Sequence, residues 1–183
     1  KWVTCPSVLT RFTRDQVRLA YNAFDVNLDI DDYHAEVFSE CNDLYLEEYK
    51  FRCDLIDNDS ILDGLEAVSG ISKQNLKQQV VIISDDQFRH FCRAAIPVQT
   101  RIALDSKTKV VKKGALWTEE SLPAETVMYQ CLSFTNARND LPKDAELIKL
   151  SFINTLLETP YLQTGGNASV GMGWFKLTHL TQP

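Results

Sequence analysis

The sequence predicts a single α+β domain that spans residues 1–183. Strand-like and helix-like patterns alternate irregularly along the chain, and strand-like runs stand near both ends. No such run leads into a Gly-x-Gly-x-x-Gly or Gly-Lys-Thr loop, so a doubly wound nucleotide-binding fold agrees less well with the sequence. A hydrophobic content of 44% is ordinary for a folded core in a chain of this length.

The first predicted elements are a strand and an amphipathic helix. Residues 1–6 have the pattern of a strand, and the chain begins inside that strand without an initiating Met. We therefore expect further sequence before Lys1. Pro6 and Ser7 stand where a helix begins. Apolar residues recur along this helix at helical spacing: Val8, Leu9, Phe12 and Leu19. Its other side carries a basic stripe that is either a solvated face or a contact surface: Arg11, Arg14 and Arg18.

An acidic region follows this helix. Residues 25–42 are predicted as a mobile acidic surface loop, because acidic residues interrupt the apolar ones there without a period. Residues 45–52 read as one strand with three aromatic rings on one face: Tyr45, Tyr49 and Phe51. Over residues 25–66, fourteen acidic residues stand against two basic ones, a local charge of −12 in a chain whose net charge is −6. The rest of the chain is therefore basic, which leaves surface for an anionic partner.

The middle of the chain is predicted to contain two helices around one buried strand. The first helix is short and covers about residues 61–68. Residues 80–83 read Val-Val-Ile-Ile, a β-branched run typical of a buried strand. Ser84 and Gln87 then have the spacing of a capping box, which predicts a second helix through about Ala95.

Residues 97–123 are predicted as a β-hairpin arm inserted into the domain. Pro97 ends the preceding helix, and two extended stretches flank residues 105–108. The arm contains the most basic stretch of the chain, residues 101–114, where Asp105 is the single acidic residue among five basic ones: Arg101, Lys107, Lys109, Lys112 and Lys113. Its apolar residues either pack across the two strands or offer contacts to unstacked bases: Ile102, Leu104, Val110 and Val111.

The last third of the chain is predicted to hold a strand, a helix and a glycine-rich turn. The strand covers residues 127–134, and the helix, with a broad apolar face, covers residues 143–157. Four of the seven glycines lie between two strand-like runs near the end of the chain: Gly165, Gly166, Gly171 and Gly173. Such a turn brings the main chain close to a ligand, and its N–H groups are able to meet phosphates. A plain flexible hairpin is the alternative.

The remaining composition argues against several kinds of site. Five dispersed cysteines without a C-x-x-C pair read as small buried hydrophobes: Cys5, Cys41, Cys53, Cys92 and Cys131. Because the three histidines are distant from them in sequence, we expect no zinc site. No apolar run reaches the roughly 20 residues that span a membrane, and no signal peptide is present. We therefore expect no membrane partner and a cytoplasmic location.

Three segments then stand in a specific order along nearly the whole chain. Residues 2–15 contain Trp-Val-Thr-Cys-Pro followed by Leu-x-Arg-Phe-x-Arg-Asp. Residues 114–126 run Gly-Ala-Leu-Trp-x-Glu-Glu-x-Leu-Pro-Ala-Glu-Thr, and residues 165–173 run Gly-Gly-x-x-x-x-Gly-x-Gly. Together these segments resemble the RAMP superfamily of CRISPR-associated proteins, specifically the repeating backbone (Cas7-type) subunit of type III-B (Cmr) RNA-guided effector complexes.

The resemblance implies an RRM-like, ferredoxin-type palm, with residues 97–123 as a β-hairpin thumb. In that family the glycine loop lies beside the crRNA backbone, and thumbs intercalate into the duplex of guide and target. The implied partners are crRNA, target RNA, further copies of the same chain in a filament and other Cmr-complex subunits in antiviral defence. The implied RNA-binding residues lie in the first helix, the hairpin and the glycine loop: Arg11, Arg14, Arg101, Lys109, Lys112, Lys113, Gly165, Gly166, Gly171 and Gly173.

The resemblance also implies an endoribonuclease that cleaves target RNA with an aspartate in an N-terminal loop and a divalent metal such as Mg²⁺. That loop would lie before Lys1, so this chain is expected to lack the main catalytic residue and is assigned no metal ligands. Glu119 and Glu120 match a thumb-base motif associated with cleavage, which makes them accessory catalytic candidates. They equally fit ion pairs with Lys112 and Lys113 across the hairpin.

Other functions remain open at this point. The chain is also consistent with a scaffold subunit that has no nuclease activity. A crRNA-processing endonuclease of the same superfamily typically uses a histidine, and the dispersion of His34, His90 and His179 argues against it. An acidic domain that docks a basic neighbour is compatible with the backbone-subunit interpretation.

Overall fold

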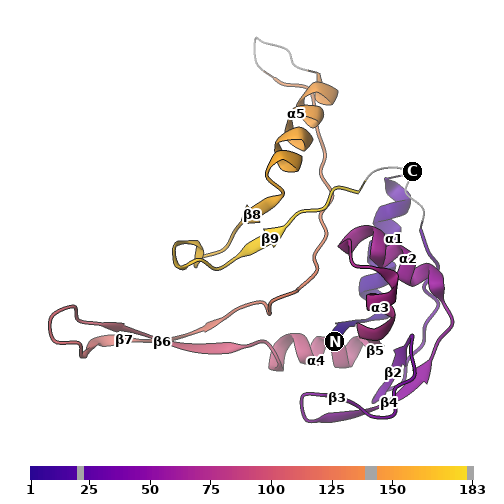
Figure 1. Ribbon diagram of the computed structural model, residues 1–183, viewed down its shortest axis with the longest axis horizontal. Helices are drawn as coiled ribbons and strands as arrows, with labels where there is room; N and C mark the ends of the chain where they lie inside the picture. The colour runs from indigo at the N-terminus through magenta and orange to yellow at the C-terminus, as the bar shows by residue number, and fades with distance from the viewer. Residues whose placement is uncertain (20–22, 139–143, 181–183) are drawn as a thin grey trace.

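A computed structural model describes residues 1–19, 23–138 and 144–180 of the chain. Five strands form its main sheet: β1 (Trp2–Thr4), β2 (His34–Val37), β3 (Leu44–Leu46), β4 (Tyr49–Leu55) and β5 (Val80–Ile83). Their spatial order is β1-β5-β2-β4-β3 (Figure 1). β1 pairs with β5, and β2 with β4, in parallel, whereas the β2–β5 and β3–β4 pairs are antiparallel. With its helices, this mixed sheet confirms the predicted α+β class.

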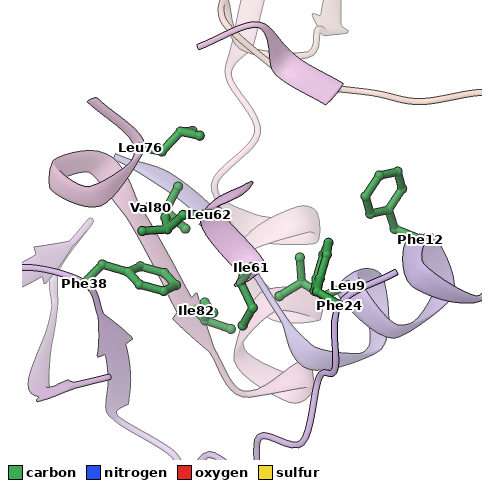
Figure 2. Packing of buried hydrophobic residues seen from close by; sticks show 9 residues of the cluster. All are labelled: Leu9, Phe12, Phe24, Phe38, Ile61, Leu62, Leu76, Val80 and Ile82. Carbon is green, nitrogen blue, oxygen red and sulfur yellow. The ribbon is translucent and has the colours of Figure 1, made fainter. Parts of the chain in front are cut away.

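Helices cover both faces of this sheet. Three helices pack on one face: α1 (Pro6–Arg18), α2 (Asp59–Ser69) and α3 (Lys73–Gln79). Figure 2 shows the core that they enclose: Leu9, Phe12, Phe24, Phe38, Ile61, Leu62, Leu76, Val80 and Ile82. On the other face, α4 (Asp85–Ala94) adds Phe88 and Phe91 to a second core with Val81 and Ile83. β5 is therefore buried on both faces, which explains its four consecutive β-branched residues.

The helix starts agree with their sequence signals. α1 begins at Pro6, and α4 begins directly after Ser84, as predicted. The Ser84 hydroxyl accepts a hydrogen bond from the Gln87 N–H at 3.3 Å and donates one to Asp32 at 2.9 Å. Within the described ranges the side-chain oxygen of Gln87 has no partner, so only one half of the capping box is formed.

The loop prediction for residues 25–42 is wrong at residues 34–37, which form the central strand β2. Ala35 and Val37 enter the second core, while His34 and Glu36 alternate to the opposite face of the sheet. A strand of four residues among acidic neighbours shows too little period-2 alternation to be recognised from the sequence. Its ladder partners in β4 and β5 decide its conformation.

The prediction of one strand over residues 45–52 is also wrong. The segment turns at Glu47, whose φ is +52°, and joins β3 to β4 as a hairpin. Tyr45 pairs with Lys50 on β3 and is exposed. Tyr49 and Phe51 share one face of β4 and both pack against Phe91, so two of the three predicted rings lie on a common face. Glutamate is not a characteristic turn residue, so the sequence carries no signal for this turn.

Residues 127–134 form no strand, contrary to prediction. Their aromatic residues instead anchor an extended connection. The ring of Tyr129 meets that of Phe12 at a centroid distance of 5.0 Å, and its hydroxyl donates a hydrogen bond to Asp15 at 2.9 Å. Phe134 lies 5.7 Å from Phe152, between ring centroids. Residues 127–134 are rich in apolar side chains because these make tertiary contacts, and no neighbouring strand in the described part of the chain pairs with them.

The second half of the chain adds two smaller two-stranded units. β6 (Val98–Leu104) and β7 (Val111–Glu120) form a hairpin that extends away from the helices in Figure 1. After α5 (Ala145–Glu158), β8 (Tyr161–Gln163) and β9 (Trp174–Lys176) pair around residues 164–173, the glycine loop. Hairpin, helix and glycine loop were all expected from the sequence. No residue of α5 is buried, and several of its apolar side chains are exposed: Leu147, Leu150, Phe152 and Leu157.

The cysteines differ in part from their predicted environment. All five are free thiols, and Cys5 is buried as expected. Cys92 and Cys131 are exposed, so the interpretation as buried hydrophobes is wrong for these two. Cys92 lies on α4 and Cys131 in the extended connection. Across the described ranges, no helix has the length and apolar character needed to cross a membrane.

Candidate nucleic-acid interface

The carboxylate of Asp105 organises the tip of the β6–β7 hairpin. It accepts hydrogen bonds from the backbone N–H groups of Lys107 and Thr108, both at 2.9 Å, and from the Thr108 hydroxyl at 3.2 Å. These hydrogen bonds hold the pKa of Asp105 below its ordinary value, and the bond from the Thr108 N–H has the largest effect. The one acidic residue of the tip is therefore engaged within the turn.

The lysines of this hairpin are exposed and available to an anion. They lie on the turn and at the start of β7: Lys107, Lys109, Lys112 and Lys113. In the part of the chain that the structure describes, none of them forms an ion pair. The predicted alternative, in which Glu119 pairs with Lys112 or Lys113, is wrong, because all three residues lie on β7 and Glu119 pairs elsewhere. Four unneutralised cations on one arm favour phosphate binding.

The apolar residues of the hairpin pack across its strands and stay partly exposed. Ile102 pairs with Leu116 and Leu104 with Val111 across the strands. These side chains nevertheless stay about half exposed, with Ile102 at 51% and Leu104 at 48%. Cross-strand packing is thus present and leaves apolar surface facing solvent.

The glycine loop is a defined structure and not a loose turn. The side-chain amide of Gln163 donates hydrogen bonds to the carbonyls of Ala168, at 2.8 Å, and Met172, at 3.1 Å. A short 3-10 helix covers Ala168–Val170. Three of the glycines adopt positive φ, at +108°, +83° and +80°, which explains their residue type: Gly165, Gly171 and Gly173.

The outer side of this loop is open. No atom lies within 4 Å of the place that a Cβ would take on Gly165, Gly166 or Gly171. Within the described residues, the backbone N–H groups of Gly165 and Gly166 have no acceptor. Free N–H groups beside open space are the arrangement that an anionic oxygen requires.

The structure joins the glycine loop to the base of the hairpin. The side-chain amide of Asn167 donates a hydrogen bond to Glu119 Oε2 at 2.8 Å. Arg101 Nε lies 3.3 Å from the same oxygen and forms an ion pair with it, without the alignment of a hydrogen bond. Arg101 Nη2 lies 3.3 Å from Met172 Sδ in the glycine loop. The indole N–H of Trp117 donates to Glu119 Oε1 at 2.7 Å. Two segments predicted separately from the sequence therefore form one surface.

The two adjacent glutamates have different environments. Glu119 accepts hydrogen bonds from Trp117 and Asn167 and lies beside Arg101. These contacts lower the pKa of Glu119, and the Trp117 hydrogen bond has the largest effect, followed by Asn167 and then Arg101. Its side chain is 25% exposed. Glu120 points to the opposite face of β7, is exposed, and has no partner among the described residues.

The arginines of α1 belong to a different surface. Arg11 and Arg14 are exposed, whereas Arg18 pairs with Asp15 at 3.8 Å. A polar groove of about 320 Å³ lies between α1 and the segment after it, lined by Pro6, Ser7, Thr10, Arg11, Arg14, Val26 and Leu28. Figure 1 separates α1 from the hairpin along the longest axis of the molecule. Arg11 and Arg14 thus lie apart from the other predicted RNA-binding residues.

The predicted glutamates do not make a metal site with their surroundings. Among the described residues, no group of three His, Cys, Asp or Glu side chains is placed to hold an ion. Both oxygens of Glu119 already accept hydrogen bonds, and Arg101 offsets its charge. A divalent cation prefers several unshared oxygen ligands, so Glu119 and Glu120 do not fit its requirements here.

Comparison with known proteins decides the family. The RAMP superfamily model matches residues 14–176, a span that includes the hairpin and the glycine loop. The chain belongs to the RAMP superfamily. It is 32% identical, over an alignment of 186 positions covering 97% of it, to the CRISPR system Cmr endoribonuclease Cmr4 of Pyrococcus furiosus. The resemblance read from the sequence is thereby confirmed.

Solved structures of RAMP proteins share the fold of this chain. A type III-B Cmr-beta complex bound to cognate target RNA contains a chain that matches with a TM-score of 0.61 at 18% identity, over 95% of this chain. Oligomeric Cmr4 from Pyrococcus furiosus matches with a TM-score of 0.54 at 22% identity, also over 95%. This RAMP chain spans 61% of the length of the curated relative, and 59% and 63% of the two solved chains.

Sequence reasoning missed the residues that join hairpin and loop. Asn167 and Met172 read only as spacers between glycines, and Trp117 as part of a motif without a stated contact. No local pattern marks a hydrogen bond between residues 48 positions apart. The alternation of β7 does indicate that Trp117 and Glu119 share a face, which is the one available signal.

Proposed function

We propose that this chain is the RNA-binding part of a backbone subunit of a type III-B Cmr effector complex. The observation that carries the proposal is the joining of an open glycine loop to the base of a lysine-rich hairpin. Loop N–H groups and hairpin lysines would bind phosphates, which needs no base-specific side chain, and base pairing with the guide would read the sequence.

The family resemblance extends this proposal to partners and architecture. The relatives include an oligomeric Cmr4 and a Cmr-beta complex bound to target RNA. We propose crRNA, target RNA, further copies of the chain and other Cmr subunits as its partners, in antiviral defence in the cytoplasm. The β6–β7 hairpin would act as the thumb and the five-stranded sheet with its helices as the RRM-like palm. Its half-exposed Ile102 and Leu104 would contact displaced bases.

Cleavage of target RNA is proposed for the full-length protein, in line with the printed name of the Pyrococcus furiosus relative. A non-catalytic scaffold is the second candidate, and one observation favours it for this chain. The carboxylate of Glu119, one of the two accessory candidates, contacts Trp117, Asn167 and Arg101 through its two oxygens. A metal-dependent cleavage assay on the reconstituted complex separates the two, because a nuclease yields evenly spaced cuts and a scaffold yields none.

RNA binding is tested by reversing the charge of the hairpin. In the assembled complex, changing Lys109, Lys112 and Lys113 together to Glu is expected to weaken RNA binding strongly. The matched control changes the same three lysines to Arg, which keeps the charge and is expected to retain affinity. Unchanged affinity in the Glu variant would show that the hairpin is not the RNA-binding arm.

A further inference from the structure

Among the described residues, Glu119 is the one carboxylate at the hairpin base that contacts both the hairpin and the glycine loop. Its Oε1 accepts the Trp117 indole N–H from its own strand, at 2.7 Å. Its Oε2 accepts the Asn167 side-chain amide from the glycine loop, at 2.8 Å, and pairs with Arg101 of β6. The neighbouring Glu120 has none of these contacts. Of two carboxylates adjacent in sequence, only Glu119 is built into the structure.

Asn167 connects this carboxylate to the internal order of the loop. Its backbone carbonyl accepts hydrogen bonds from Val170 N–H at 3.1 Å and Met172 N–H at 3.2 Å. Met172 in turn lies against Arg101 through its sulfur. The loop is therefore held at Asn167 and at Met172, on either side of Gly171, and both residues contact the base of the hairpin.

The glycine loop needs such a connection because its own strands are short. β8 and β9 have three residues each and pair only with one another. An isolated two-stranded hairpin is marginally stable in water. Contacts with the β6–β7 hairpin therefore determine how firmly the loop is oriented.

We propose that Glu119 is a positioning residue that fastens the glycine loop to the base of the β6–β7 hairpin through Asn167, and that it does not ligate metal or transfer protons. The carboxylate keeps the open N–H groups of Gly165 and Gly166 at a set place relative to the hairpin lysines. The link itself does not depend on RNA. Its consequence for RNA affinity rests on the proposed function.

Amide hydrogen exchange of the free chain tests the link without RNA. Changing Glu119 to Gln removes the charge that pairs with Arg101, and its amide N–H₂ meets an acceptor only if the Asn167 side-chain amide turns over. Changing Asn167 to Asp places two carboxylates together. Each single change is expected to raise exchange rates over residues 164–173 by about fivefold or more. The double variant E119Q/N167D reverses the polarity of the hydrogen bond and lets the new loop carboxylate pair with Arg101, so slow exchange is expected to return. E120Q is the matched control and is expected to leave exchange unchanged.

Exchange at Val80–Ile83 reports whether each variant keeps its core, since this strand is buried on both faces. If E119Q unfolds that core, N167A removes the same link from the loop side and is judged instead. The proposal is overturned if the single variants leave loop exchange unchanged, or if the double variant exchanges as fast as they do.

RNA affinity, measured separately on the assembled complex, distinguishes this inference from the proposed function. Reduced affinity in E119Q that returns in the double variant supports a positioning role, because the double variant restores the link between hairpin and loop without a carboxylate at position 119. If even the unmodified complex fails to bind RNA while the exchange pattern holds, the proposed function is wrong and the link stands. An affinity unchanged in E119Q despite faster loop exchange overturns the claim that the link matters for binding.

Discussion

The backbone of Gly173 packs directly against the carbonyl group of Thr164. A Cβ built on Gly173 would overlap that carbonyl oxygen, and the φ of Gly173 is +80°. The two residues are also bonded, since Thr164 N–H donates to the Gly173 carbonyl at 2.9 Å. This contact closes the glycine loop where its two ends meet, at Thr164 and Gly173, and only glycine fits at residue 173.

Changing Gly173 to Ala is therefore expected to break the β8–β9 pairing. Positive φ alone costs an L-residue about 1–2 kcal/mol, and the overlap with Thr164 adds to that cost. Gly166 supplies the control, because its φ is not positive and no atom lies within 4 Å of its would-be Cβ. NMR of residues 161–176 should show lost cross-strand contacts in G173A and native contacts in G166A. Equal spectra for the two variants would refute the claim that residue 173 must be glycine.

The link between Glu119 and Asn167 is expected to depend on pH in the acidic range. Hydrogen bonds from Trp117 and Asn167, then Arg101, lower the pKa of Glu119 from its ordinary value of 4.5. A lowered pKa in the folded state means that the stabilisation is complete above 4.5 and is lost as pH falls through the lower folded value. The ¹⁵N shift of the Asn167 side-chain amide should titrate with a midpoint below 4.5. A midpoint at or above that value contradicts the link.

Glu36 is expected to destabilise the fold while it is ionised. Burial, then the nearby Asp54, raises the pKa of Glu36, although His34 acts in the opposite direction. Its Oε2 is buried without a hydrogen-bond partner among the described residues. A raised pKa in the folded state means that stability is greatest where Glu36 is protonated and falls as pH rises through that value.

The variant E36Q should therefore unfold at a higher temperature than the unmodified chain at pH near 7. The difference should shrink below 4.5, the ordinary pKa, where both forms are neutral. Glu40→Gln is the control, since Glu40 is exposed, and it should change the midpoint little. A lower midpoint for E36Q at neutral pH would show that the ionised carboxylate has a stabilising partner.

The hairpin lysines are expected to set the salt dependence of RNA binding. Each phosphate contact to a single strand contributes about 0.7 to the slope of log affinity against log salt. Neutralising Lys109, Lys112 and Lys113 together with Gln should reduce that slope by about 2. Titrations at several salt concentrations measure it, and an unchanged slope would place the phosphate contacts elsewhere on the chain.

Much of the fold was predictable from signals that act over a few residues. The Val80–Ile83 strand, the Ser84 cap, the β6–β7 hairpin and the glycine loop all lie where the sequence places them. Two of the errors share a cause. β2 and the Glu47 turn carry no strong local preference, and pairing partners elsewhere in the chain decide their conformation.

The sequence by itself determined the α+β class, the basic arm, the glycine loop and the resemblance to RAMP proteins, because hydrophobic period, charge and glycine content are local properties. The tertiary structure alone decided what Glu119 does. It brings Asn167, 48 positions away, to the carboxylate and leaves Glu120 on the opposite face. A hydrogen bond of about 3 Å depends on how two chain segments pack, and no spacing along one segment encodes that distance.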